Sequence, residues 1–174
     1  LHRELVTRGA SATFRATGQT GVLIDGHGYA IDAIVSDFLA GAVEALTPAG
    51  AADHWDIVEG QGAIIHPAYA GVTLGLLHGA QPDAFVVCHE AGRENLLGFP
   101  GHKTGSIEEI ITLITVLGRK VSPNIQCAGI CLNTSRLSEA VAQRALAELS
   151  HEHNLPACDP VRFGVSEIVD RLVK

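Results

Sequence analysis

Short apolar segments of strand character alternate along the chain with segments of helical periodicity, and this alternation is the strongest constraint on the fold. Strands are predicted at 11–17, 55–59, 84–89, 125–132 and 156–158, and helices at 1–8, 31–46, 69–78, 106–120 and 138–153. Because the strands are apolar on both faces, helices must cover each face of a parallel sheet. The sequence therefore predicts a single α/β domain over residues 1–174, with a doubly wound parallel sheet.

Several local features refine this prediction. Four glycines, at 18, 21, 26 and 28, indicate a loop between the first strand and the helix at 31–46. The chain contains no methionine and starts in a helix-like segment at Leu1, so we expect a further piece upstream. The four cysteines form no Cys-x-x-Cys pair and lie in apolar stretches, which is typical of reduced, buried thiols in a cytoplasmic protein.

Composition narrows the range of partners. The net charge is −7, from 12 Lys and Arg against 19 Asp and Glu, and no basic run is present. A nucleic-acid groove or an anionic membrane surface is therefore disfavoured. No apolar run reaches the roughly 18 residues of a membrane span. We expect a cytoplasmic protein that binds a small molecule and forms a homo-oligomer.

Polar residues follow the apolar strands at the points where the strands end. Glu59, His89, Asn133 and Asp159 each come directly at the end of a predicted strand. Ligands of open α/β sheets bind at the carboxyl ends of the strands, so we expect these side chains, with Gln19 and Thr20, to share one edge. A carboxylate such as Glu59 in this place can act as a general base or hold a metal ion. A structural cap is the alternative role.

Other candidate residues leave more than one interpretation open. His66 near a helix start can act as acid, base or hydrogen-bond donor, or be structural. Arg93 and Arg162 can each hold a carboxylate or phosphate, or form a surface ion pair. The glycine-rich segment 98–105 lacks the spacing of a phosphate loop and is predicted to be a loop before the helix at 106. Zinc-ligand spacings, dinucleotide-binding fingerprints and the nucleophile elbow of Ser/His/Asp hydrolases are not found.

The order of the motifs resembles the dethiobiotin synthetase branch of the P-loop NTPases. More closely, and over nearly all 174 residues, the chain resembles the C-terminal, P-loop-NTPase-like domain of the D-glutamate N-acetyltransferase family. The motifs that carry the resemblance are Ala16-Thr-Gly-Gln-Thr-Gly21, Val58-Glu-Gly-Gln-Gly62, His66-Pro-Ala-Tyr69, the segment 71–79, Leu132-Asn-Thr134 and Asp159-Pro-Val-Arg-Phe-Gly164. The resemblance implies that the first strand and the phosphate loop of such a domain lie upstream of Leu1.

The resemblance also implies an activity, the transfer of an acetyl group from acetyl-CoA to an acidic amino acid such as D-glutamate. Glu59 and His66 are then the expected catalytic residues, and Glu59 matches the acid that helps hold magnesium in the synthetase branch. Expected substrate-binding residues are Arg15, Thr17, Gln19, Thr20, Gly21, Gly60, Gly62, Tyr69 and Arg93. Expected nucleotide- or CoA-binding residues are Asn133, Thr134, Asp159 and Arg162. Two alternatives are an ATP- and Mg-dependent ligase or kinase, disfavoured by Ala16 where the synthetases carry lysine, and a non-catalytic nucleotide- or CoA-binding module.

Overall fold

The computed structural model describes residues 1–173, and these residues form two compact units. The first comprises Leu1–Pro82 together with Val116–Pro123, and the second comprises Asp83–Thr115 together with the residues from Asn124 onward. Each unit contains its own parallel sheet. That all 174 residues act as one domain stays a prediction.

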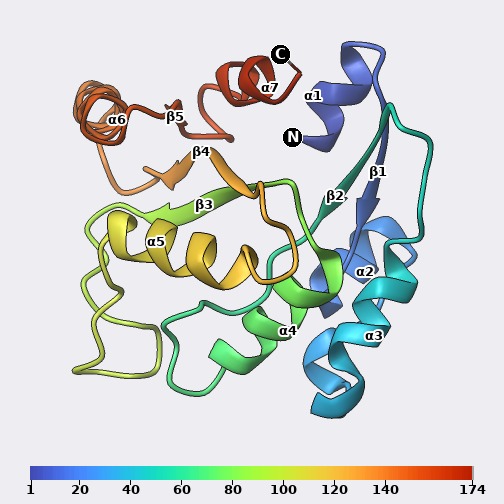
Figure 1. Ribbon diagram of the computed structural model, residues 1–174. Helices are drawn as coiled ribbons and strands as arrows, with labels where there is room; N and C mark the ends of the chain where they lie inside the picture. Colours follow the sequence, from blue (N-terminus) through green and yellow to red (C-terminus); the bar gives the residue numbers. More distant parts are fainter. Residues whose placement is uncertain (174) are drawn as a thin grey trace. The chain divides into compact units, whose positions relative to one another are not determined.

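The first unit is built on two parallel strands, β1 and β2 (Figure 1). Its elements are α1 (His2–Thr7), β1 (Ser11–Arg15), α2 (Gln19–Asp25), the 3-10 turn η1 (Ile31–Ala33), α3 (Ser36–Leu46), β2 (His54–Val58) and α4 (Ala70–Ala80). The strands pair from Ser11 opposite His54 to Arg15 opposite Val58. Both strands therefore end at the same level, which brings the residues that follow each of them close together.

The expectation of a loop over the glycines at 18–28 is wrong, because α2 lies there. Gly18 is extended (φ −132°, ψ 163°) at the start of the helix, and Gly26 (φ 83°) adopts the left-handed conformation that ends many helices. Between them, Val22, Leu23 and Ile24 continue the helix. Gly18 and Gly26 thus mark the two ends of α2. The helix predicted at 31–46 is also divided, since η1 comes first and α3 begins only at Ser36.

Close packing of α3 against α4 supplies the core of the first unit (Figure 1). A Cβ atom at Gly79 would come within 2.4 Å of the carbonyl oxygen of Ala40, and one at Gly75 within 2.4 Å of Leu39 Cδ2. Only glycine therefore permits this approach of the two helices. The buried side chains between them are Ile31, Leu39, Val43 and Leu76.

The second unit has three parallel strands in the order β3-β4-β5, so β4 lies between its two partners (Figure 1). Its elements are β3 (Ala84–Glu90), α5 (Ile107–Gly118, whose last residues belong to the first unit), β4 (Gln126–Asn133), α6 (Glu139–His153), β5 (Ala157–Cys158) and α7 (Ser166–Leu172). Helix α7 was not expected from the sequence. Its Ile168 packs against Gly129 of β4, whereas α5 and α6 contribute to a core around Ile130. Since Gly129 and Ile130 point to opposite faces, helices cover both faces of this sheet.

The predicted α/β fold with parallel sheets and alternating helices is confirmed. The prediction of buried cysteines is correct for Cys127, Cys131 and Cys158 but wrong for Cys88, which is exposed on β3. The glycine-rich segment 98–105 is a loop, as expected, with an isolated antiparallel bridge between Asn95 and Lys103. Among residues 1–173, no helix is long and apolar enough to cross a bilayer.

Candidate functional site

Glu59, the residue after β2, is bound to the chain that leaves β1. Its Oε2 accepts hydrogen bonds from the backbone N–H of Thr17 (2.9 Å) and of Gly18 (3.0 Å). The hydroxyl of Thr17, which is fully buried, donates to the Glu59 carbonyl oxygen at 2.7 Å, and the Glu59 N–H donates to the carbonyl of Arg15. The carboxylate is thus fixed at the N-terminal end of α2, where the helix dipole favours a negative charge. Both side-chain hydrogen bonds end on Oε2.

Two glycines make room for this arrangement. A Cβ atom at Gly21 would lie 2.1 Å from Glu59 Oε2, and one at Gly18 would lie 2.1 Å from Nε2 of Gln61. The carboxylate of Glu59 and the amide of Gln61 therefore lie directly against α2. Gln61 was not among the residues expected from the sequence. Its position inside the Gly60-Gln-Gly62 turn, between two flexible residues, was the signal that could have identified it.

The turn after Glu59 is held by α4 and continues into His66. The hydroxyl of Thr73 donates to the carbonyl of Gln61 at 2.8 Å, and Gly62 has the left-handed φ of 65°. Nδ1 of His66 accepts hydrogen bonds from the N–H groups of Ala68 and Tyr69. A neutral His66 ring then carries its proton on Nε2. The half-exposed ring of Tyr69 lies 4.7 Å from the His66 ring, centroid to centroid.

Arg15 at the end of β1 is part of a polar row on the face of the two strands. Its Nε donates to Oδ1 of Asp56 at 2.7 Å, and Nε2 of His54 lies 3.6 Å from the same oxygen. Nδ1 of His54 is 2.7 Å from the hydroxyl of Ser11. Arg15 also lines a cavity of about 310 Å³. Gln19 and Thr20, in the first turn of α2, are exposed.

In the second unit, Asp159 lies buried beside the end of β4 and accepts four hydrogen bonds. Oδ2 accepts from the N–H (2.9 Å) and the hydroxyl (2.5 Å) of Thr134, and Oδ1 accepts from the N–H groups of Val161 (2.9 Å) and Arg162 (3.1 Å). Burial by itself disfavours the carboxylate, but these hydrogen bonds outweigh it, and the pKa of Asp159 lies below its ordinary value. Asp159 is 2% exposed and Thr134 is fully buried, so each side chain satisfies the hydrogen-bonding groups of the other inside the fold.

Arg162 completes this cluster from the loop after β5. Its Nη1 donates to the carbonyl of Thr134 (3.2 Å), the hydroxyl of Thr134 (3.2 Å) and the carbonyl of Leu137 (3.1 Å). These bonds aim the guanidinium along the exit of β4. Asn133, exposed at the end of the same strand, accepts a hydrogen bond from the N–H of Ser135 at Oδ1.

Arg93 and His89 lie at the end of β3. Arg93 pairs closely with Glu90, whose other oxygen lies 3.4 Å from Nε of Arg136. The sequence-predicted anion-binding role of Arg93 therefore competes with an internal carboxylate. Burial and the nearby positive charge of Arg93 lower the pKa of His89, so its ring is neutral at physiological pH.

The expected site residues thus fall into two clusters, one in each unit. Arg15, Thr17, Gly21, Glu59, Gly60, Gly62, His66 and Tyr69 belong to the first unit, and Arg93, Asn133, Thr134, Asp159 and Arg162 belong to the second. In the described part of the chain, no group of three or more His, Cys, Asp or Glu is placed to hold a metal ion. Mg²⁺ commonly needs only one or two carboxylates besides water and phosphate. Glu59 fits that limited role through Oε1.

Parallel sheets that alternate with helices, and polar clusters at the carboxyl ends of their strands, define an α/β fold of the class to which P-loop domains belong. Residues 1–169 match the family model described as "Domain of unknown function (DUF1611_C) P-loop domain". The chain belongs to this family, which confirms the resemblance that its motifs predict.

Three known proteins illustrate the relationship. The chain is 44% identical, over 172 residues, to proteins of Tritonibacter scottomollicae and of a Pseudoalteromonas species, both named D-glutamate N-acetyltransferase. The match covers 99% of this chain and 52% of each relative. The crystal structure of a DUF1611 family protein from Anabaena variabilis superposes with a TM-score of 0.92 at 36% identity, over 99% of this chain and 51% of that one. The chain therefore spans about half the length of these relatives.

Proposed function

We propose that the protein containing this chain transfers an acetyl group from acetyl-CoA to the amino group of D-glutamate. The observation that carries the proposal is the 44% identity, over 99% of the chain, to two proteins named for D-glutamate N-acetylation. The reaction requires a base for the substrate ammonium group, hydrogen-bond donors for the thioester carbonyl oxygen, and cationic side chains for the carboxylate and phosphate groups. The clusters at the strand ends contain residues of each kind.

Glu59 is proposed as the base. The backbone amides of Thr17 and Gly18 hold Oε2, which directs the side chain and leaves Oε1 to accept a proton from the ammonium group. The free amine then attacks the thioester carbonyl, the new C–N bond forms, and the C–S bond breaks with departure of the CoA thiolate. The proton held on Glu59 passes to that thiolate, and the regenerated carboxylate then takes the second proton, which the nitrogen still carries after the attack, and releases it to solvent.

His66 is proposed as a hydrogen-bond donor to the substrate. Because Nδ1 accepts from two backbone amides, the neutral ring can donate only through Nε2. A donor aimed at the thioester carbonyl would stabilise the negative charge that develops there during attack. This argument assigns the proton-accepting role to Glu59 alone.

Arginines and polar backbone groups are proposed to bind the charged parts of the two substrates. Arg15 donates from Nε to Asp56, and its Nη atoms are proposed to bind a carboxylate of D-glutamate, with Gln19 and Thr20 as further proposed hydrogen-bond partners. Arg162 and Asn133 are proposed to contact the phosphates or base of CoA. Thr134 and Asp159 hold Arg162 in place through the hydrogen bonds described above.

The intact protein tests the proposal in an assay of CoA release with acetyl-CoA and either D- or L-glutamate. We expect thiol release with D-glutamate and formation of N-acetyl-D-glutamate, identified by mass spectrometry. The absence of CoA release with both enantiomers would refute the proposal.

The description of the family as a P-loop domain favours one alternative, an ATP- and Mg-dependent ligase or kinase with Glu59 near the metal. That activity predicts ADP formation and a higher Tm in the presence of ATP and Mg²⁺. The same preparation can be assayed for both products, so CoA release without ADP would support acetyl transfer. Binding of acetyl-CoA or ATP without release of CoA or ADP would indicate a non-catalytic regulatory module.

A further inference from the structure

Three of the four cysteines form a row across the sheet of the second unit. Cys88 of β3 is paired in register with Cys131 of β4, and Cys131 is paired with Cys158 of β5. Residues paired across parallel strands point to the same face, so the three thiols lie side by side. The fourth, Cys127, belongs to the opposite face, because the pairing slips between Phe85 and Val86 and Cys127 joins the core around Ile130.

A sulfur–sulfur hydrogen bond joins Cys131 and Cys158. Their Sγ atoms are 3.9 Å apart, within reach of a sulfur hydrogen bond. A thiolate on Cys158 accepts that bond from the Cys131 thiol, which lowers the pKa of Cys158 and raises the pKa of Cys131 to about 11. Cα atoms of paired residues on adjacent strands lie about 4.8 Å apart, inside the range that disulfides span.

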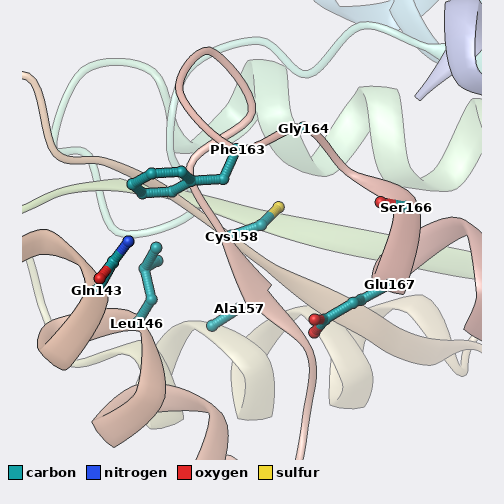
Figure 2. A pocket seen from close by; sticks show the side chains of 8 residues that line it. All are labelled: Gln143, Leu146, Ala157, Cys158, Phe163, Gly164, Ser166 and Glu167. Carbon is teal, nitrogen blue, oxygen red and sulfur yellow. The ribbon is translucent and has the colours of Figure 1, made fainter. Parts of the chain in front are cut away.

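Cys158 also faces a cavity that could admit a small reagent. The cavity measures about 210 Å³ and lies among α6, β5 and the loop before α7. Figure 2 shows the Cys158 thiol beneath the loop that carries Phe163 and Gly164, with Glu167 and Gln143 on other walls. A water molecule occupies about 30 Å³ in the liquid, so hydrogen peroxide, which is only modestly larger, fits easily.

From this geometry we propose that Cys158 and Cys131 form a peroxide-reactive dithiol. The Cys158 thiolate attacks one oxygen of the hydroperoxide, the O–O bond breaks, and the leaving oxygen departs as hydroxide or alkoxide, which gives a sulfenic acid on Cys158. The Cys131 sulfur then attacks Cys158 Sγ, the S–O bond breaks, and water leaves with the thiol proton. The balance is two thiols and one peroxide to one disulfide and, for hydrogen peroxide, two waters.

The position of the dithiol couples it to the cluster at the strand ends. Cys158 immediately precedes Asp159, and Cys131 lies three residues before Thr134. To form the disulfide, the two sulfur atoms must approach by about 2 Å, and rotation of the two side chains can supply this because the strand spacing already suits a disulfide. We expect this rearrangement to alter the packing beside Asp159 and Thr134, which position Arg162.

The test is a peptide map of the intact protein after treatment with hydrogen peroxide, alkylation of the remaining thiols and proteolysis. We expect a Cys131–Cys158 linked peptide that dithiothreitol removes, with Cys127 still alkylated. Four alkylated cysteines after treatment, a Cys88–Cys131 link, or a Cys158 sulfinic acid without any link would each overturn the proposal. The wild-type map gives this result without any variant.

Variants then separate the two roles. In Cys131→Ser, the sulfenic acid on Cys158 should persist and react with dimedone, whereas Cys158→Ser should form neither species. Cys127→Ser is the matched control, since Cys127 is a buried thiol on the same strand that donates to the carbonyl of Gly129 at 3.6 Å and lies on the opposite face of the sheet. A Cys158 that forms no dimedone adduct in Cys131→Ser, or a link that disappears in Cys127→Ser with Tm unchanged, would contradict the assignment.

Discussion

Replacing Asp159 by Asn tests whether this buried carboxylate holds the second unit together. The oxygen of the asparagine side chain can still accept hydrogen bonds from the N–H groups of Val161 and Arg162. Its NH₂ group, however, takes the place of Oδ2, which accepts from Thr134. The Thr134 N–H, in a fully buried residue, then loses its acceptor. An unsatisfied buried donor costs about 1–3 kcal/mol, and loss of the charge weakens the remaining bonds, so we expect Asp159→Asn to destabilise by about 2–3 kcal/mol.

Thermal unfolding of the intact protein measures this effect. At about 2 °C per kcal/mol for a chain of this size, Tm should fall by about 4–6 °C at pH 7. The folded-state pKa of Asp159 is lowered, so its stabilisation is present above the unfolded pKa of about 3.9 and is lost as the pH falls below it. The difference in Tm between wild type and variant should therefore shrink below about pH 4. Asp53→Asn, at an exposed position, is the control. A variant with wild-type Tm at pH 7, or a difference independent of pH, would refute the reasoning.

Three further outcomes are expected. Glu59→Gln keeps an acceptor for the Thr17 and Gly18 amides but removes the base, so kcat for acetyl transfer should fall about 10²–10⁴-fold with KM little changed; an unchanged kcat would exclude Glu59 as the base. Gly21→Ala places a methyl group 2.1 Å from Glu59 Oε2 and should reduce kcat by displacing the carboxylate, whereas Gly41→Ala, with no atom within 4 Å, should leave kcat intact. The lowered pKa of His89 means that, as the pH falls below about 6.5, the unfolded chain binds a proton at this residue more readily than the folded chain, which costs stability. His89→Gln should therefore lose less Tm than the wild type on acidification, and equal pH profiles of Tm would contradict this.

The sequence predicted the strands better than the helices, for a physical reason. A strand that is apolar on both faces can be recognised from its own residues. The strand expected at 84–89, for example, is β3, Ala84–Glu90, in the structure. Helix α2 was missed because glycines that begin and end a helix look, in sequence, like glycines of a loop. Gly21 inside that helix is explained only by contact with Glu59, which lies 38 residues further along the chain.

The positions of Glu59 and Asp159 at strand ends were predictable from the sequence, but their hydrogen bonds were not. The placement of Glu59 and Asp159 at strand ends follows from the apolar runs before them. Each carboxylate accepts hydrogen bonds from a particular threonine after the neighbouring strand. Strand order and register decide which threonine this is, and no local sequence pattern specifies them. Gln61 was missed for the same reason, since its importance lies in its contact with Gly18.

Glu59 and Asp159 occupy equivalent positions at strand ends, but they differ in how many of their carboxylate oxygens accept the hydrogen bonds described above. In both cases a buried threonine follows the neighbouring strand, Thr17 after β1 and Thr134 after β4, and its N–H donates to the acid at the end of the adjacent strand. Asp159 uses both oxygens for four hydrogen bonds and is 2% exposed, which suits a structural tie. Glu59 is half-buried, and the bonds that hold it end on Oε2. The same arrangement therefore fixes both oxygens of Asp159 but only Oε2 of Glu59. Because we propose that Glu59 acts through Oε1, the effect of Asp159→Asn should appear in Tm and that of Glu59→Gln in kcat.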